Sequence, residues 1–173
     1  PRWAKHVAWQ CDEDAYNASG QKCSAQSFLF VHKNWEKDLL PRLKELASKR
    51  KLENLDIGPI LTWTNQQITE HIDCLLTIPG SRILFGGKKL LNNTIPPIYG
   101  SYQPTALEIP IEKILGDHFE IITKEVFGPF QIIVVYEDKD MKIVKKTLEN
   151  ISQNLTAAIV SNDILFQQEI LAS

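Results

Sequence analysis

Short apolar, β-branched runs alternate with amphipathic helical segments, and this alternation constrains the possible folds most. The clearest run is Gln131-Ile-Ile-Val-Val-Tyr136, whose composition is typical of a buried strand. The same pattern predicts further strands at residues 27–32, 82–85, 105–109 and 156–160. Apolar residues at helical spacing predict helices over residues 3–11, 38–47, 64–76, 141–151 and 161–171. Strands and helices in this order predict an α/β fold with an open, mainly parallel, doubly wound sheet flanked by helices.

Two of the expected helices have distinct starting signals. The helix from about Asp38 would hold Pro41 in its first turn, where a missing N–H costs little. Its other face and its C-terminal end, with Lys44, Lys49, Arg50 and Lys51, are interpreted as a solvated, basic surface. The next helix has a capping box, Thr64-x-x-Gln67, at its start.

Both ends of the chain fall within helical patterns. The first helix has no clear cap, and no stop signal closes the last one. We therefore expect a chain truncated at both ends. Its 173 residues correspond to about one domain at roughly 150 residues per domain.

The charge and the hydropathy pattern exclude several classes of protein. The net charge is −2, whereas nucleic-acid binders carry strongly basic surfaces. No apolar run approaches the roughly 18 residues of a membrane helix, and no targeting segment is present. We expect neither a nucleic-acid partner nor a membrane partner.

Phosphate-binding and metal-binding motifs are missing. The sequence contains no G-x-G-x-x-G, and the stretch from Gly80 to Lys89 fails the P-loop spacing. The four histidines and three cysteines show no metal-ligand spacing, so we expect no metal site. A nucleotide cofactor would need most of its site from other polypeptide.

Cys23 is the strongest candidate for a catalytic residue. Small residues surround it in a loop before the strand at 27–32, and Lys22 precedes it. A neighbouring cation favours the nucleophilic thiolate, and loop N–H groups can stabilise an oxyanion. An inert loop cysteine explains the same pattern. Cys11 and Cys74 lie on helical apolar faces and are interpreted as core residues.

A second candidate site lies in Thr123-Lys-Glu-Val-Phe-Gly-Pro-Phe130, just before the clearest strand. In an extended segment Glu125 and Phe127 would face the same side. A carboxylate can accept two hydrogen bonds from a sugar diol, and an aromatic ring can lie against a flat ring. A charged loop residue beside a core phenylalanine is the simpler interpretation.

Together these segments resemble the aldehyde dehydrogenase superfamily. Gly20-Gln-Lys-Cys-Ser-Ala25 is similar to its cysteine motif, and Glu125-Val-Phe-Gly-Pro129 to its E-x-F-G-P signature. Leu155-Thr-Ala-Ala-Ile-Val-Ser-Asn-Asp163 resembles a later segment, in the expected order. Within the superfamily the chain most resembles the plant-type delta-1-pyrroline-5-carboxylate dehydrogenases.

The resemblance implies a mechanism and roles for individual residues. Cys23 would attack the aldehyde carbon of L-glutamate γ-semialdehyde, and Ser24 would bind the substrate carboxylate. Glu125 would hold the nicotinamide ribose of NAD, and Phe127 would pack near the nicotinamide.

The resemblance also implies that parts of the enzyme are absent. Residues 1–173 would be a partial catalytic domain without the general base, the NAD-binding domain and the oligomerisation arm. The full-length parent would be a homo-oligomeric enzyme of the mitochondrial matrix. Two alternatives remain open: an inactive truncated domain that only binds partners, and a cysteine hydrolase that uses one of the histidines.

Overall fold

The computed structural model describes residues 2–152 and 155–172. Four strands form one sheet: β1 (Phe28–His32), β2 (Arg82–Phe85), β3 (Thr105–Glu108) and β4 (Phe130–Tyr136). The main helices are α1 (Ala4–Tyr16), α2 (Lys33–Lys49), α3 (Asn65–Leu76), α4 (Phe119–Ile122), α5 (Met141–Asn150) and α6 (Ile164–Leu171). Short helical turns occupy Asn17–Gly20, Ile111–Lys113 and Asp138–Asp140.

The sheet has the strand order β1-β4-β3-β2. β4 runs parallel to β1 and to β3, and β2 joins β3 antiparallel at the edge. The predicted fold class, an open and mainly parallel sheet flanked by helices, is therefore confirmed.

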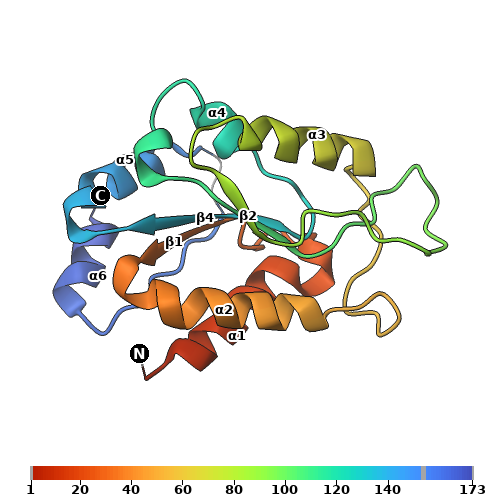
Figure 1. Cartoon of the computed structure of the whole chain (residues 1–173). Helices are drawn as coiled ribbons and strands as arrows, with labels where there is room; N and C mark the ends of the chain where they lie inside the picture. The colour runs from red at the N-terminus through yellow and green to blue at the C-terminus, as the bar shows by residue number, and fades with distance from the viewer. Residues whose placement is uncertain (1, 153–154, 173) are drawn as a thin grey trace.

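Two helical layers cover the two faces of the sheet (Figure 1). Ile132 and Val134 of β4 pack in one core with α3 and α4. Ile133, between them in sequence, packs in the other core with α1 and α2, because successive strand side chains point to opposite faces. β4 is buried on both sides, which explains its continuous apolar run.

The start of α2 differs from the prediction. The helix begins at Lys33 rather than near Asp38, directly after β1, and His32 Nδ1 accepts a hydrogen bond from the Asn34 N–H (3.3 Å). Pro41 is therefore inside the helix and exposed to solvent, not in its first turn. The prediction began at the leucine run and missed this earlier start.

Three further predictions were wrong. Residues 156–160 form no strand, and Leu155 before them and Val160 at their end are both exposed; a strand needs a hydrogen-bonded neighbour. Cys74 is exposed rather than part of the core. The Arg50 side chain is 11% exposed rather than solvated, and it pairs with Asp12.

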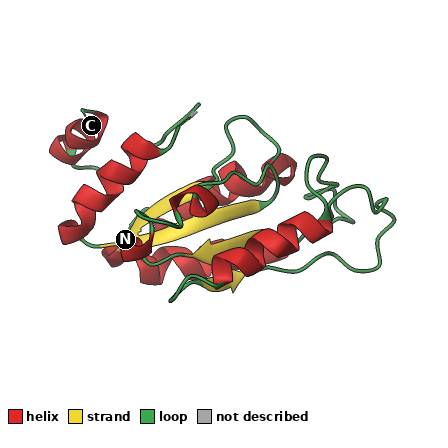
Figure 2. Cartoon of the chain, turned by 90° about the horizontal axis from the view of Figure 1, so that it is seen from above, coloured by secondary structure: helices red, strands yellow, loops and turns green. Residues whose placement is uncertain are grey.

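The end of the described chain lies apart from the main core. Figures 1 and 2 both show α5 and α6 at one end of the sheet. α6 buries none of its residues, and Lys145 of α5 pairs with Glu169 of α6 at 2.6 Å. None of the helices in the described part of the chain has the length and hydropathy of a membrane-spanning segment.

Candidate active site

A left-handed turn leads from α1 to Cys23. Ala18, Ser19 and Gly20 all have positive φ (53°, 56° and 66°), a region that residues other than glycine seldom adopt. Ser19 compensates for this strain, since its buried Oγ accepts the Gly58 N–H at 2.6 Å. The turn places the cysteine loop between the end of α1 and β1.

Cys23 and Ser24 form an exposed turn beyond this point. The Ala25 N–H donates to the Lys22 carbonyl oxygen (3.0 Å) and closes the turn. Within residues 2–152 and 155–172, the N–H groups of Cys23 and Ser24 donate to no other protein group, so they are available to an oxyanion. The Lys22 ammonium donates to the Glu13 carbonyl oxygen (3.0 Å).

The Gln21 side chain fastens the loop to the segment Gly58–Leu61. Its Nε2 donates to the Pro59 carbonyl oxygen (2.9 Å), and its Oε1 accepts the Leu61 N–H (2.8 Å). An amide side chain that bonds both ways holds the backbone in one register. No local sequence pattern indicates this role of Gln21, because its partners lie far away in the chain.

A buried polar network links β4 to Tyr16 and Gln26, which lie before and after the cysteine loop in the chain. Gln131 of β4 donates from Nε2 to the Tyr16 hydroxyl (2.7 Å), and this hydroxyl donates to the Thr105 carbonyl oxygen (3.1 Å). Gln26 donates from Nε2 to the Gln131 Oε1 (2.7 Å). Burial raises the pKa of Tyr16, so the hydroxyl remains a neutral donor. One sequence signal could have identified this network: a glutamine inside an otherwise apolar strand.

The segment before β4 brings the second candidate site next to the cysteine loop. Glu125 is exposed, Val126 is buried and Phe127 is half-buried. A Cβ at Gly20 would collide with the Gly128 carbonyl oxygen, so the two motifs touch through their glycines. The Thr62 hydroxyl also donates to the Phe127 carbonyl oxygen (3.4 Å).

A cluster of aromatic rings lies beside Lys124, the residue before Glu125. The Lys124 ammonium lies 5.2 Å from the ring centroid of Trp63, which lies 5.8 Å from that of His71. His71 in turn packs edge-on against Phe130 at 5.6 Å. Desolvation, with a contribution from Lys124, lowers the pKa of His71 to about 4. The neutral imidazole is therefore the form that fits among these groups.

The residues present fit one edge of a dinucleotide site. The exposed Glu125 carboxylate can accept hydrogen bonds from a ribose diol, and the half-buried Phe127 ring, two residues later in the chain, can pack against a flat ring. No group of three or more potential metal ligands gathers in the described part of the chain.

The three cysteines differ in their surroundings. Burial raises the pKa of Cys11 to about 12, so its thiol is unreactive at neutral pH. Cys23 and Cys74 are both exposed. No hydrogen bond among the described residues joins a histidine to Cys23, and His71 is buried in its aromatic cluster. The geometry therefore gives no support to a cysteine hydrolase.

Comparison with known proteins identifies the family. The aldehyde dehydrogenase family profile matches residues 5–172. A delta-1-pyrroline-5-carboxylate dehydrogenase of Arabidopsis thaliana, named as mitochondrial, is 56% identical over 97% of this chain. This chain spans 31% of that relative's length.

Two solved structures share the fold at low identity. A bifunctional proline utilization A protein matches with a TM-score of 0.77 at 22% identity, over 98% of this chain and 16% of its own. A gamma-glutamyl-gamma-aminobutyraldehyde dehydrogenase from Burkholderia cenocepacia matches with a TM-score of 0.77 at 19% identity, over 98% and 33%. With the family profile covering nearly every residue, the chain belongs to the aldehyde dehydrogenase family.

Proposed function

We propose that this chain carries the nucleophile and one edge of the cofactor site of an NAD-dependent dehydrogenase for L-glutamate γ-semialdehyde. That aldehyde is the open form of 1-pyrroline-5-carboxylate. One observation carries the proposal: Cys23 is exposed on a fastened loop that touches the Glu125–Pro129 segment through Gly20 and Gly128. The 56% identity with the Arabidopsis relative supports this choice of substrate.

The chemistry begins at Cys23. Its thiolate sulfur bonds to the aldehyde carbon, and the π electrons of the carbonyl move to the oxygen. The available N–H of Cys23 donates to this oxyanion. NAD, when bound, would supply the hydride acceptor that is needed to convert this Cys23 adduct into a thioester. Water then hydrolyses the thioester to glutamate and frees the thiol.

The neighbouring residues bind and orient. The Glu125 carboxylate would accept hydrogen bonds from the nicotinamide ribose hydroxyls, and Phe127 would pack near the nicotinamide. The Ser24 hydroxyl donates a hydrogen bond to the substrate carboxylate. This contact selects an aldehyde that carries a carboxylate at its other end.

In this proposal, polypeptide outside residues 1–173 completes the active site. The Arabidopsis relative is about three times as long as this chain, which supports a partial catalytic domain at 1–173. The general base, the NAD-binding domain and the oligomerisation arm lie in the additional polypeptide of such an enzyme. The relative's name supports a mitochondrial location, and we assign a homo-oligomeric state to the full-length parent.

Alkylation of cysteines tests the nucleophile. Cys74 is a matched control because both thiols are exposed, and Cys11 is a buried control. We expect iodoacetamide to modify Cys23 faster than Cys74 at neutral pH, measured by mass spectrometry of peptides over time. Equal rates would remove the catalytic assignment and favour an inactive domain that only binds partners.

An activity assay tests whether parts are missing. The purified 173-residue chain should not reduce NAD in the presence of glutamate γ-semialdehyde, because the chain lacks the motifs for the general base and the dinucleotide domain. Steady NADH formation by this chain, lost in Cys23→Ala, would show that the site is complete without other polypeptide.

A further inference from the structure

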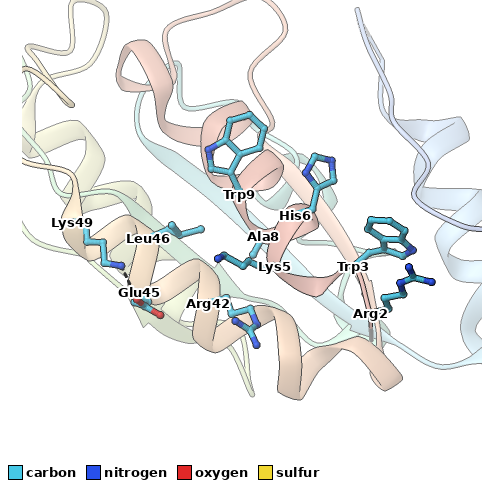
Figure 3. Close-up of a pocket in the computed structure, with 10 residues that line it drawn as sticks. All are labelled: Arg2, Trp3, Lys5, His6, Ala8, Trp9, Arg42, Glu45, Leu46 and Lys49. Atoms are coloured by element: carbon cyan, nitrogen blue, oxygen red, sulfur yellow. Dashed lines mark hydrogen bonds and ion pairs between the residues drawn. The ribbon is translucent and has the colours of Figure 1, made fainter.

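A groove outside the candidate active site lies between α1 and α2. Its lining comes from the first half of α1 with the two residues before it and from the second half of α2, and its volume is about 600 Å³ (Figure 3). No residue of the cysteine loop or of the Glu125–Pro129 segment lines it. A volume of this size is within the range of ligand and anchor pockets, roughly 300–1,000 Å³.

The groove is cationic although the chain as a whole is acidic. Arg2, Lys5, Arg42 and Lys49 line it, with Glu45 as the only acidic residue in the lining. The Glu45 carboxylate already pairs with Lys49 at 2.6 Å. The net charge of the chain is −2. The positive charge of this face therefore attracts anions although the protein as a whole is negatively charged.

Two tryptophan side chains that line the groove are about half exposed to solvent. Trp3 is 52% exposed and Trp9 is 49% exposed. The Arg2 guanidinium lies 5.2 Å from the Trp3 ring centroid, and the His6 ring stacks on Trp9 at 6.0 Å. These contacts hold the rings in place without covering them. Tryptophan and arginine are among the residues most enriched at the energetic centres of protein interfaces.

The helix α1 has a buried side and an exposed side. Ala4, Val7 and Ala8 bury its inner side in the core. Trp3 and Trp9 contribute to neither core cluster. Their large apolar surface therefore does little for the stability of the described fold, and a second surface laid on the groove would bury it.

We infer that this groove is a docking surface for an acidic polypeptide segment that carries an apolar side chain. Its carboxylates meet Lys5 and Arg42, and its apolar side chain packs on the exposed surface of the Trp3 and Trp9 indoles. Charge complementarity selects an acidic partner over a basic one. The cations and rings spread over two helices, which suits a polypeptide better than a single small anion. This inference does not depend on the chemistry assigned to Cys23.

Fluorescence anisotropy with a labelled peptide of glutamate and leucine residues tests the docking surface. We expect saturable binding that weakens with rising NaCl, because exposed charge pairs are screened. A peptide with lysine in place of glutamate should bind at least about tenfold more weakly. A peptide with serine in place of leucine should also lose affinity, because it offers the indoles no apolar partner.

Variants of the chain locate the binding. The double variant Lys5→Glu and Arg42→Glu should weaken binding by about tenfold or more, and Trp9→Ala by about fivefold. All three residues are exposed, so circular dichroism should show an unchanged fold. Lys142→Glu makes the same kind of charge change on α5, outside the groove lining, and should leave the affinity unchanged.

Four outcomes would overturn the inference. Equal affinity for the acidic and basic peptides would remove the charge argument, and an unaffected double variant would place the binding elsewhere. Complete competition by ADP at equal concentration would identify a small-anion site. A dimer, seen by sedimentation, that dissociates on Trp9→Ala would make a second copy the occupant.

Discussion

Gly20 is the residue at which the two motifs of the candidate active site touch. Its φ is +66°, and an added Cβ would meet the Gly128 carbonyl oxygen. We expect Gly20→Ala to lower the free energy of unfolding by at least about 2 kcal/mol, from the strained φ and the clash together. Urea unfolding followed by circular dichroism measures this loss.

Gly58→Ala is the matched control for this substitution. Its nearest neighbour to an added Cβ is the Ser19 Oγ, at 3.9 Å, an ordinary contact distance. We expect a change of less than about 1 kcal/mol. Similar losses in both variants would show that the close approach of Gly20 to Gly128 does not decide the stability of this region.

His71 makes the stability of the chain depend on pH. Its pKa is lowered from 6.5 to about 4, so between these values the unfolded chain binds a proton that the folded chain does not. The free energy of unfolding should therefore fall as the pH drops from about 6.5 toward 4, by about 2–3 kcal/mol. Unfolding at a series of pH values should show this fall, with a smaller one in His71→Phe.

His118→Phe controls for the loss of a histidine in general. His118 is exposed at the start of α4. The variant should therefore show the same dependence of stability on pH as the parent chain. A His71→Phe chain that keeps the full dependence would show that other groups cause it.

At the scale of the elements, α1 and α2 are joined by a buried ion pair. The Arg50 guanidinium donates to the Asp12 carboxylate at 2.7 Å, and the two side chains are 11% and 5% exposed. Burial raises the pKa of Asp12 despite this partner. We expect Arg50→Met to lower the free energy of unfolding by about 3 kcal/mol, because it leaves a buried carboxylate unpaired.

A second substitution separates the charge from the packing. Asp12→Asn combined with Arg50→Met removes the buried unpaired charge and leaves only the partly exposed Glu13 without its arginine partner, so it should restore part of the loss in chemical unfolding. If the double variant is as unstable as the sum of two independent losses, the pair is not coupled.

At the scale of the whole molecule, the C-terminal part contributes little to stability. Leu155, Ile164, Leu165 and Leu171 are at least 70% exposed, and α6 buries no residue. The Lys145–Glu169 pair is on the surface and is worth at most about 1 kcal/mol. We expect a chain that ends at residue 151 to unfold at nearly the same urea concentration and to self-associate less.

Truncation at the N-terminus should have a much larger effect on stability. Removal of residues 1–9 takes away the buried Ala4, Val7 and Ala8 together with half of α1, and should prevent stable folding. A C-terminal cut with the same effect would mean that residues 152–173 belong to the core.

The sequence by itself determined the fold class, most element positions and both motifs of the candidate active site. Each of these depends on local signals: the alternation of strands and helices, the capping box at Thr64, and the residue types around Cys23 and Glu125. It did not predict that α2 begins at Lys33, or that residues 156–160 form no strand.

Only the tertiary structure decided which distant residues meet. The contact of Gly20 with Gly128, the Gln21 bonds to Pro59 and Leu61, and the burial of His71 all join segments far apart in the chain. A strand needs a neighbour and a buried polar group needs a partner, and no local pattern identifies either. The same reason applies to the groove between α1 and α2, whose cations and indoles become one surface only when the two helices pack together.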